Sequence, residues 1–149
     1  MGYTTAAGTA LAISAAHPAT QDAAGFVALT YTTISKVDKI GTFGGTFAKV
    51  EFQPLVGGKL KLKGSVDYGT LNPTMARDPS DAGQTLLQTA ANNTTNTNYS
   101  FKITRQDGSI VYCEGLVFGF PETIDGADTV NTASPTIEIS NQPIYVAAP

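Results

Sequence analysis

The sequence has few of the residues that catalysis and metal binding use. Its 149 residues include one histidine, one cysteine and no tryptophan. With His17 and Cys113 as the single residues of their types, no metal-site spacing is present, an internal disulfide is excluded, and no nucleophile elbow is recognisable. We therefore predict no enzyme, no catalytic or metal-binding residues and no cofactor. Cys113 ends the apolar run IVYC, which predicts an inert thiol buried in the core.

Long apolar runs and early basic residues are lacking as well. No stretch approaches the ~20 apolar residues that a membrane-spanning helix needs. A secretory signal begins with a basic segment, whereas the first basic residue of this chain is Lys36. The sequence therefore predicts no membrane segment and a protein that is made and used without export.

Three local patterns are weak candidates for binding sites. Glu122, Asp125 and Asp128 lie around a glycine, but the alternating acids of a calcium loop are absent, which favours a solvated turn. The segment GTFGG at 41–45 lacks the lysine and the spacing of a phosphate loop and indicates a flexible turn. The run of lysines at 59, 61 and 63 is the one candidate for nucleic acid, and a pI near 4.9 argues against tight binding.

Charges of opposite sign are separated along the chain. Six lysines and two acids lie between Lys36 and Lys63, whereas six acids and no base follow Arg105. This separation is compatible with the basic face of one copy meeting the acidic face of another, and also with two solvated faces of a monomer. The residues that we predict at contacts between subunits or rings are Lys36, Lys39, Lys59, Lys61, Lys63, Glu122, Asp125, Asp128 and Glu138.

Alternating apolar and polar residues predict strands over most of the chain. The predicted strands are Thr9–Ala16, Val27–Val37, Phe47–Phe52, Lys59–Val66, Thr70–Ala76, Tyr99–Thr104, Ser109–Phe118 and a last one that contains Ile137 and Ile139. Pro73 places the Thr70–Ala76 strand at an edge or a bulge. Strand 47–52 suits one wet face, and Leu60 and Leu62 are expected in the core of their own subunit.

Two local signals are more specific. In RQDG a two-residue turn would pair Ile103 with Tyr112, whereas a bulged turn would pair Ile103 with Val111; the bulged register gathers the apolar residues on one face and is preferred. Asp78 as cap with Pro79 at the first helical position predicts one short helix that ends near Asn92. Its expected apolar stripe consists of Ala82, Leu86, Leu87, Ala90 and Ala91.

Together these elements predict a mainly β, antiparallel sandwich or barrel with one short flanking α-helix. The chain is expected to form a single domain, 1–149, with an N-terminal arm at about 1–8 and a C-terminal arm at about 141–149. No internal repeat is found.

The order of these segments resembles the tail tube proteins, or major tail proteins, of long-tailed bacteriophages. The resemblance covers roughly residues 8–140 and rests on GTALAISAAHPAT, GFVALTYTTISKVDKIGTFGG, KLKGSVDYGTLNPTMARDPSDAGQTLLQTA, YSFKITRQDGSIVYCEGLVFGF and DTVNTASPTIEIS in succession. It implies a sandwich-like subunit that forms rings of six, which stack into a hollow tube through which DNA passes without sequence-specific binding. The segment between Val37 and Phe47 lies where such proteins have a loop that reaches a neighbouring ring.

The resemblance implies a structural virion protein whose partners are its own copies and other tail proteins at the tube ends. It would be assembled in the host cytoplasm and located in the tail. Lys59, Lys61 and Lys63 would face the acidic segment of a neighbour, the outside of the tube or the lumen. The inner tube of a contractile tail or secretion system fits the same pattern. A monomeric carbohydrate-binding or adhesion module is the alternative, although the missing tryptophan and scattered tyrosines count against it.

Overall fold

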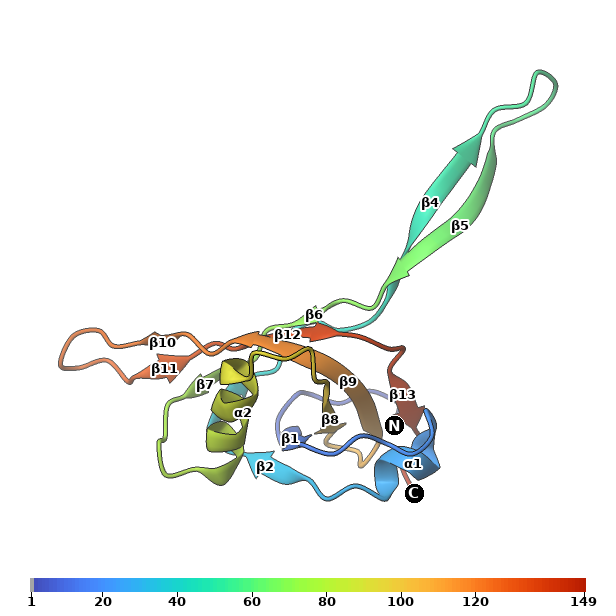
Figure 1. The fold of residues 1–149 in the computed structure, drawn as a ribbon. Helices are drawn as coiled ribbons and strands as arrows, with labels where there is room; N and C mark the ends of the chain where they lie inside the picture. Colours follow the sequence, from blue (N-terminus) through green and yellow to red (C-terminus); the bar gives the residue numbers. More distant parts are fainter. Residues whose placement is uncertain (1) are drawn as a thin grey trace.

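The computed structural model describes residues 2–149. Met1, the first residue of the predicted N-terminal arm, lies outside the described part of the chain. The centre of the protein is a seven-stranded antiparallel sheet in the order β2-β1-β8-β9-β12-β6, with β13 also paired to β9 (Figure 1). Its strands are β1 (Ala10–Ser14), β2 (Thr32–Ile34), β6 (Thr70–Leu71), β8 (Tyr99–Thr104), β9 (Ile110–Gly119), β12 (Thr136–Ile139) and β13 (Ile144–Val146).

Two smaller sheets accompany the central one. The first has the order β10-β11-β7-β3 and consists of β3 (Val37–Lys39), β7 (Thr74–Ala76), β10 (Glu122–Thr123) and β11 (Thr132–Ala133). The second is the hairpin of β4 (Thr46–Phe52) and β5 (Leu60–Asp67). The fold is mainly antiparallel β and sandwich-like, as predicted, and residues 2–149 do not close into a barrel.

The β8–β9 hairpin has the predicted bulged register. Ile103 pairs with Val111 and Phe101 pairs with Cys113. The turn is closed by hydrogen bonds from Arg105 N to Ser109 O and from Gly108 N to Arg105 O. Gly108 has a φ of 92°, which a residue with a side chain seldom adopts. The turn thus places the odd-numbered apolar residues of both strands on the same face of the sheet.

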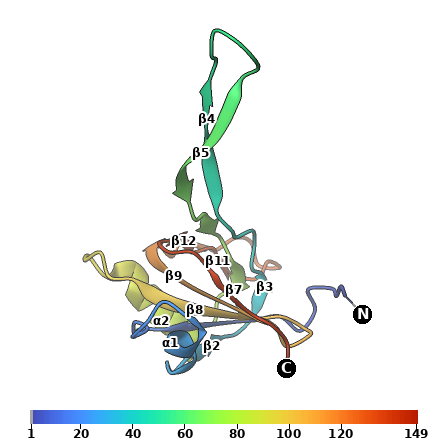
Figure 2. The ribbon, with the colours of Figure 1, turned by 90° about the vertical axis from the view of Figure 1, so that its right-hand side faces the viewer.

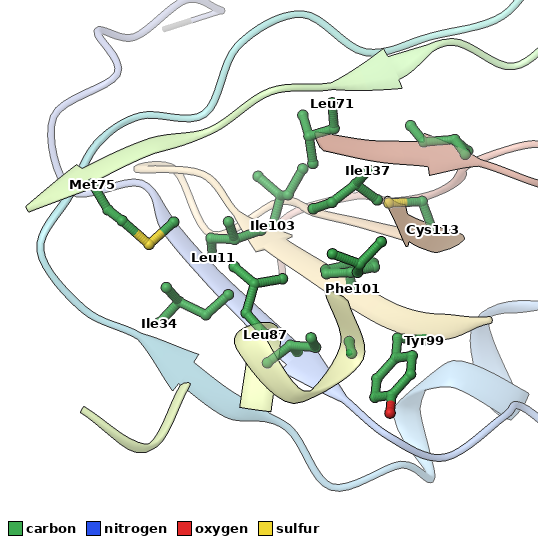
Figure 3. Close-up of a cluster of buried hydrophobic side chains, with 14 of the residues drawn as sticks. Leu11, Ile34, Leu71, Met75, Leu87, Tyr99, Phe101, Ile103, Cys113 and Ile137 are labelled. Carbon is green, nitrogen blue, oxygen red and sulfur yellow. The ribbon is translucent and has the colours of Figure 1, made fainter. Parts of the chain in front are cut away.

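That face of the sheet carries the core (Figure 3). The side chains of Leu11, Phe101 and Ile137 are fully buried there, together with Leu87 from the helix and Met75 from the smaller sheet. Every fully buried side chain of this size contributes about 1.5–3 kcal/mol relative to an exposed one. The core therefore joins the central sheet, the smaller sheet and a helix into one body.

Two helices flank the body, whereas the sequence predicted one. Helix α2 (Ala82–Asn92) is the expected helix, and α1 (Ala23–Val27) is additional. Asp22 caps α1, because its Oδ1 accepts a hydrogen bond from Gly25 N at 2.9 Å. The ring of Phe26 stacks on Tyr112 with 5.5 Å between centroids. Neither helix of the described chain has the length and hydropathy that crossing a bilayer requires.

Helix α2 begins three residues later than predicted. Its cap is Asp81, which accepts a hydrogen bond from Gln84 N, whereas Asp78 accepts one from Ser80 N and so closes a turn before the helix. The prediction of Asp78 as cap and Pro79 as first helical residue was wrong because that pattern fits the preceding turn equally well. Asn92, the predicted end, is the last helical residue.

The buried face of α2 contains four of the five residues of the predicted stripe, since Leu87 and Ala90 are buried and Leu86 and Ala91 pack against the core. Ala82 is exposed, whereas Gly83 and Gln84 are buried beside Leu87. A Cβ on Gly83 would lie 2.3 Å from Thr33 O, so only glycine allows this close approach of helix and strand. Gln84 Nε2 donates to Ser35 O and Ala76 O, which ties the helix to the β2–β3 connection and to the end of β7 and makes a buried polar residue favourable.

Two predicted strands are in fact divided. Segment 27–37 contributes the end of α1, strand β2 and the first residue of β3, and β2 and β3 belong to different sheets. Segment 70–76 splits into β6 and β7, again in different sheets, on either side of the buried Pro73. A proline lacks the N–H that a continuous strand would need, which explains the break.

Candidate assembly surface

The β4–β5 hairpin projects far from the body (Figures 1 and 2). Among the described residues, its strands pair only with each other. Glycines shape its root: Gly44 and Gly69 have φ of 127° and 96°, and a Cβ on Gly69 would lie 2.7 Å from Gly44 O. The segment GTFGG therefore lies at the root of the hairpin, where its two strands leave the body side by side.

The register gives this hairpin two chemically different faces. Val50 pairs with Leu62 and Phe52 with Leu60, and the residues of a cross-strand pair share a face, so these four form an apolar face. Lys49 pairs with Lys63 and Glu51 pairs with Lys61, which places these residues on the opposite face. We call the first set the apolar face of the hairpin and the second, with Lys59, its basic face.

The apolar face is exposed, which corrects two predictions. Phe52 is 61 % exposed and Leu62 is 65 % exposed, and every residue of β4 is exposed. Leu60 and Leu62 therefore do not lie in the core of their own subunit, and both faces of strand 47–52 are exposed to solvent instead of one. Alternation had indicated an amphipathic strand correctly, but none of the described residues, 2–149, covers its apolar side.

The basic face carries more charge than its own acid neutralises. Glu51 forms ion pairs with Lys49 at 2.8 Å and with Lys59 at 3.3 Å. Lys63 lies 4.9 Å from the ring centroid of Phe47, and within residues 2–149 neither it nor Lys61 has a carboxylate within ion-pair distance. Four lysines against Glu51 give the segment 49–63 a net charge of +3.

A second projection carries the opposite charge. Strands β10 and β11 extend from another side of the body (Figure 1), and all residues from Glu122 to Asn131 are exposed. Glu122 is held by Arg77, whose Nε lies 2.7 Å from Oε1. Asp125 and Asp128 form no ion pair with the described residues. We call segment 122–131 the acidic lobe; its three acids and lack of bases give a net charge of −3.

The remaining predicted contact residues lie elsewhere. Lys36 precedes β3 with a φ of 63°, and Lys39 ends that strand, so both belong to the body and not to the hairpin. Glu138 lies on β12, where Thr70 Oγ1 donates to its Oε2 at 2.7 Å. The structure thus gathers three of the five predicted lysines on the hairpin and three of the four predicted acids in the lobe.

One acid of the C-terminal half is buried in the body. Glu114 on β9 accepts hydrogen bonds from Gln21 Nε2 at 2.9 Å and Asn98 Nδ2 at 3.2 Å, and His17 Nδ1 lies 3.9 Å away. Ser140 Oγ donates to Asn98 Oδ1. This cluster fastens the connection between β1 and α1 to the sheet and was not foreseen, because its members are far apart in the sequence.

The remaining sites that bear on the sequence predictions are the thiol of Cys113, the possible metal ligands and a groove. Burial raises the pKa of the Cys113 thiol to about 12, so the predicted inert thiol is present. Within residues 2–149 no three His, Cys, Asp or Glu side chains are grouped so that they could hold a metal ion. A groove of about 650 Å³ lies between residues 4–9 and 37–43, and its charged lining residues are Asp38, Lys39 and Arg105.

The two ends of the described chain differ in structure. Residues 2–9 form no strand and border the groove just described. The C-terminal segment contains β13, in which Tyr145 pairs with Val111 on β9. The assignment of both ends as terminal arms stays a prediction.

Comparison with known proteins finds similar folds but no similar sequences. No protein-family model matches the chain, and no curated protein matches its sequence. The sheath/tube terminator of an extracellular contractile injection system, PVC, in its extended state has a TM-score of 0.67 at 10% identity, with 97% of this chain and 98% of the other covered.

Two further structures are similar over nearly the whole chain. One belongs to the sheath-tube complex of the PVC injection system in its extended state, with a TM-score of 0.63, 9% identity, and 94% and 88% coverage. The other belongs to the baseplate of the anti-feeding prophage, with a TM-score of 0.68, 8% identity, and 99% and 98% coverage. The chain therefore has a fold that occurs in tube, terminator and baseplate assemblies of contractile injection systems.

Proposed function

We propose that the protein is a structural subunit of a phage-tail-like particle and that its copies assemble into stacked rings around a hollow tube. The observation that carries this proposal is the β4–β5 hairpin, whose apolar face is exposed in the single chain. The similar folds support the same function, because all three belong to tubular injection machines or their baseplate.

The energetics of the hairpin favour a partner. An isolated two-stranded hairpin is marginally stable in water and is stabilised by packing against another surface. Burying four half-exposed apolar side chains contributes several kcal/mol, at about 1.5–3 kcal/mol for each complete burial. Association itself costs about 4–15 kcal/mol, so one such contact is weak. Repetition of the contact around a ring makes the assembly stable.

The finer features of the proposal come from the resemblance to tail tube proteins. We infer six copies per ring, a tail location after assembly in the host cytoplasm, other tail proteins at the tube ends, and a lumen that DNA crosses without sequence-specific binding. The net charge of −3 per chain supports a passage that repels a duplex. A single domain with terminal arms, 1–8 and 141–149, fits this architecture.

The alternative of a monomeric binding module receives less support from the exposed aromatic residues. Tyr3, Phe52, Phe118 and Tyr145 are each more than half exposed, but they belong to four different segments of the chain. A carbohydrate-binding face needs such residues side by side.

Negative-stain microscopy and light scattering of the purified chain over a range of concentrations test the proposal. We expect rings or tubes with a central hole, in equilibrium with a smaller species. A chain that stays monomeric at the highest soluble concentration, both alone and with tube fragments added as seeds, would contradict it.

A matched pair of variants tests the role of the hairpin. Replacing Phe52, Leu60 and Leu62 by threonine keeps strand propensity but removes the apolar face, so assembly is expected to be lost while the melting temperature of the monomer changes little. Val27→Thr is the control, because Val27 is 62 % exposed on the body and the change is isosteric. Equal assembly of both variants would show that the hairpin is not the contact.

A further inference from the structure

The hairpin and the acidic lobe are complementary in charge and in apolar content. Segment 49–63 of the hairpin has a net charge of +3, carried on the face opposite its apolar face, and segment 122–131 of the lobe has a net charge of −3. The lobe also exposes Ile124 and Val130, at 75 % and 67 %. Each projection thus combines uncovered apolar side chains with charges of one sign.

The two projections of a single chain do not meet. In Figure 1 the hairpin and the lobe leave the body on opposite sides, with the central sheet between them. Within residues 2–149, Lys61, Asp125 and Asp128 therefore form no ion pair. Any contact between hairpin and lobe has to join different copies.

Pairing of like projections is unfavourable. Lys49 lies opposite Lys63 across the hairpin, so two hairpins placed basic face to basic face would repel each other. Two acidic lobes would repel each other in the same way. A contact between unlike surfaces avoids this repulsion and, because it is not self-complementary, repeats from copy to copy into a ring or a stack.

We propose that the β4–β5 hairpin of one copy docks on the acidic lobe of a second copy. In this contact the apolar face covers Ile124 and Val130, and the flexible lysine side chains of the opposite face reach past the edge of the two-stranded hairpin to Asp125 and Asp128. The charges select the partner surface and its orientation, and the apolar side chains supply most of the stability. This inference rests on the proposed self-assembly and names the surface that the hairpin meets.

Charge reversal tests the pairing. The hairpin variant replaces Lys59, Lys61 and Lys63 by glutamate, and the lobe variant replaces Asp125 and Asp128 by lysine. We expect each variant alone to assemble only at a protein concentration about tenfold higher than the wild type needs, or more, since attraction becomes repulsion.

Mixing the two variants is the decisive step. The reversed hairpin fits the reversed lobe of the other variant, and the unaltered hairpin of that variant fits the unaltered lobe, so the mixture is expected to assemble with alternating copies. A chain that carries both reversals is expected to assemble alone. Lys102→Glu, on β8 of the body and outside the predicted contact residues, is the control that keeps assembly near the wild-type level. Circular dichroism of each variant checks that it is folded.

The outcomes separate this inference from the proposed function. Reversed variants that assemble as the wild type does would overturn the pairing, and so would variants that lose assembly without rescue in the mixture. In both cases wild-type assembly leaves the proposed function standing. A wild type that does not assemble overturns both.

Discussion

The described chain contains two long antiparallel hairpins that alternate apolar and polar residues in a similar way, but the apolar residues of one are buried and those of the other are exposed. In β8–β9 the residue Phe101 is fully buried, whereas in β4–β5 the residue Phe52 is 61 % exposed. The first hairpin lies in the middle of the central sheet and packs against a helix, and within residues 2–149 the second pairs with no other strand. Alternation therefore reveals that a strand has an apolar face, but not which molecule covers it.

The largest difference between the two hairpins is expected in the free energy of unfolding. Phe101→Ala leaves a cavity in the core and should cost about 3–5 kcal/mol. Phe52→Ala removes an exposed side chain and should change the stability of the monomer by about 0.5 kcal/mol or less. Urea denaturation of both variants measures this. Equal losses would mean that the hairpin packs against its own body in solution.

Glycine-to-alanine substitutions should distinguish the packed body from the exposed β4–β5 hairpin by the space available for an added Cβ. An alanine Cβ at Gly83 would meet Thr33 O at 2.3 Å, so Gly83→Ala should destabilise by about 1–3 kcal/mol although alanine is the better helix former by about 1 kcal/mol. Gly58, near the hairpin tip, has nothing within 4 Å of such a Cβ, and Gly58→Ala should be nearly neutral. Thermal unfolding compares the two, and a neutral Gly83→Ala would contradict the close helix approach.

Carboxylates in the two regions should differ in their contribution to stability. Asp81 caps α2 and accepts a hydrogen bond from Ser35 Oγ at 2.6 Å. Asp81→Ala should cost about 1–2 kcal/mol, and Asp81→Asn less, because asparagine also caps helices. Glu51 makes only ion pairs with exposed lysines, so Glu51→Ala should cost about 0.5 kcal/mol or less. Chemical denaturation at neutral pH ranks the three variants.

The effect at Asp81 should depend on pH. Burial raises its pKa, but hydrogen bonds from Ser35 and Gln84 outweigh this effect and leave the pKa below the ordinary value of 3.8. Because the folded-state pKa is the lower one, the contribution of the carboxylate is complete above about pH 4 and is lost as the pH falls through the folded-state pKa. The stability difference between wild type and Asp81→Asn should shrink in that acid range, and a difference constant down to pH 2 would contradict the assigned hydrogen bonds.

The smallest expected effect is one of reactivity, without a change in stability. Cys113 is 2 % exposed with a raised pKa, so a thiol reagent should modify the native protein only as it unfolds. A cysteine in place of Leu62 on the hairpin should react at the rate of a free thiol in the monomer and more slowly after assembly. Fast modification of Cys113 in the native wild type would show that β9 is more accessible than the fold implies.

Local chemistry in the sequence was sufficient for some elements. The turn at Gly108 gave the register of β8–β9 correctly, because glycine and the apolar pattern agree there. Helix α2 was found, but its start was misplaced, since Asp78 and Asp81 both have capping chemistry and only the tertiary bond to Ser35 favours the second. Helix α1 was missed although Asp22 signals a cap, because five residues are too few for a visible apolar period.

The candidate surface was predictable in composition but not in position. Separation of lysines from acids along the chain indicated two charged regions, and the hairpin and the lobe contain most of those residues. Their projection from the body depends on glycines at the hairpin root and on the absence of a third strand, which the sequence does not reveal. Glu114 is one of the acids of the C-terminal half of the sequence, but it is buried in the structure. Hydrogen bonds from Gln21 and Asn98 replace those that water would make to its carboxylate.

Amide hydrogen exchange, followed by mass spectrometry in the assembled and the dissociated protein, tests most directly whether other copies cover the β4–β5 hairpin. Segment 99–119 should be protected in both states, since its bonds lie within the central sheet. Segment 46–67 should exchange rapidly in the dissociated chain and become protected in the assembly. Rapid exchange of segment 46–67 in both states would contradict the account.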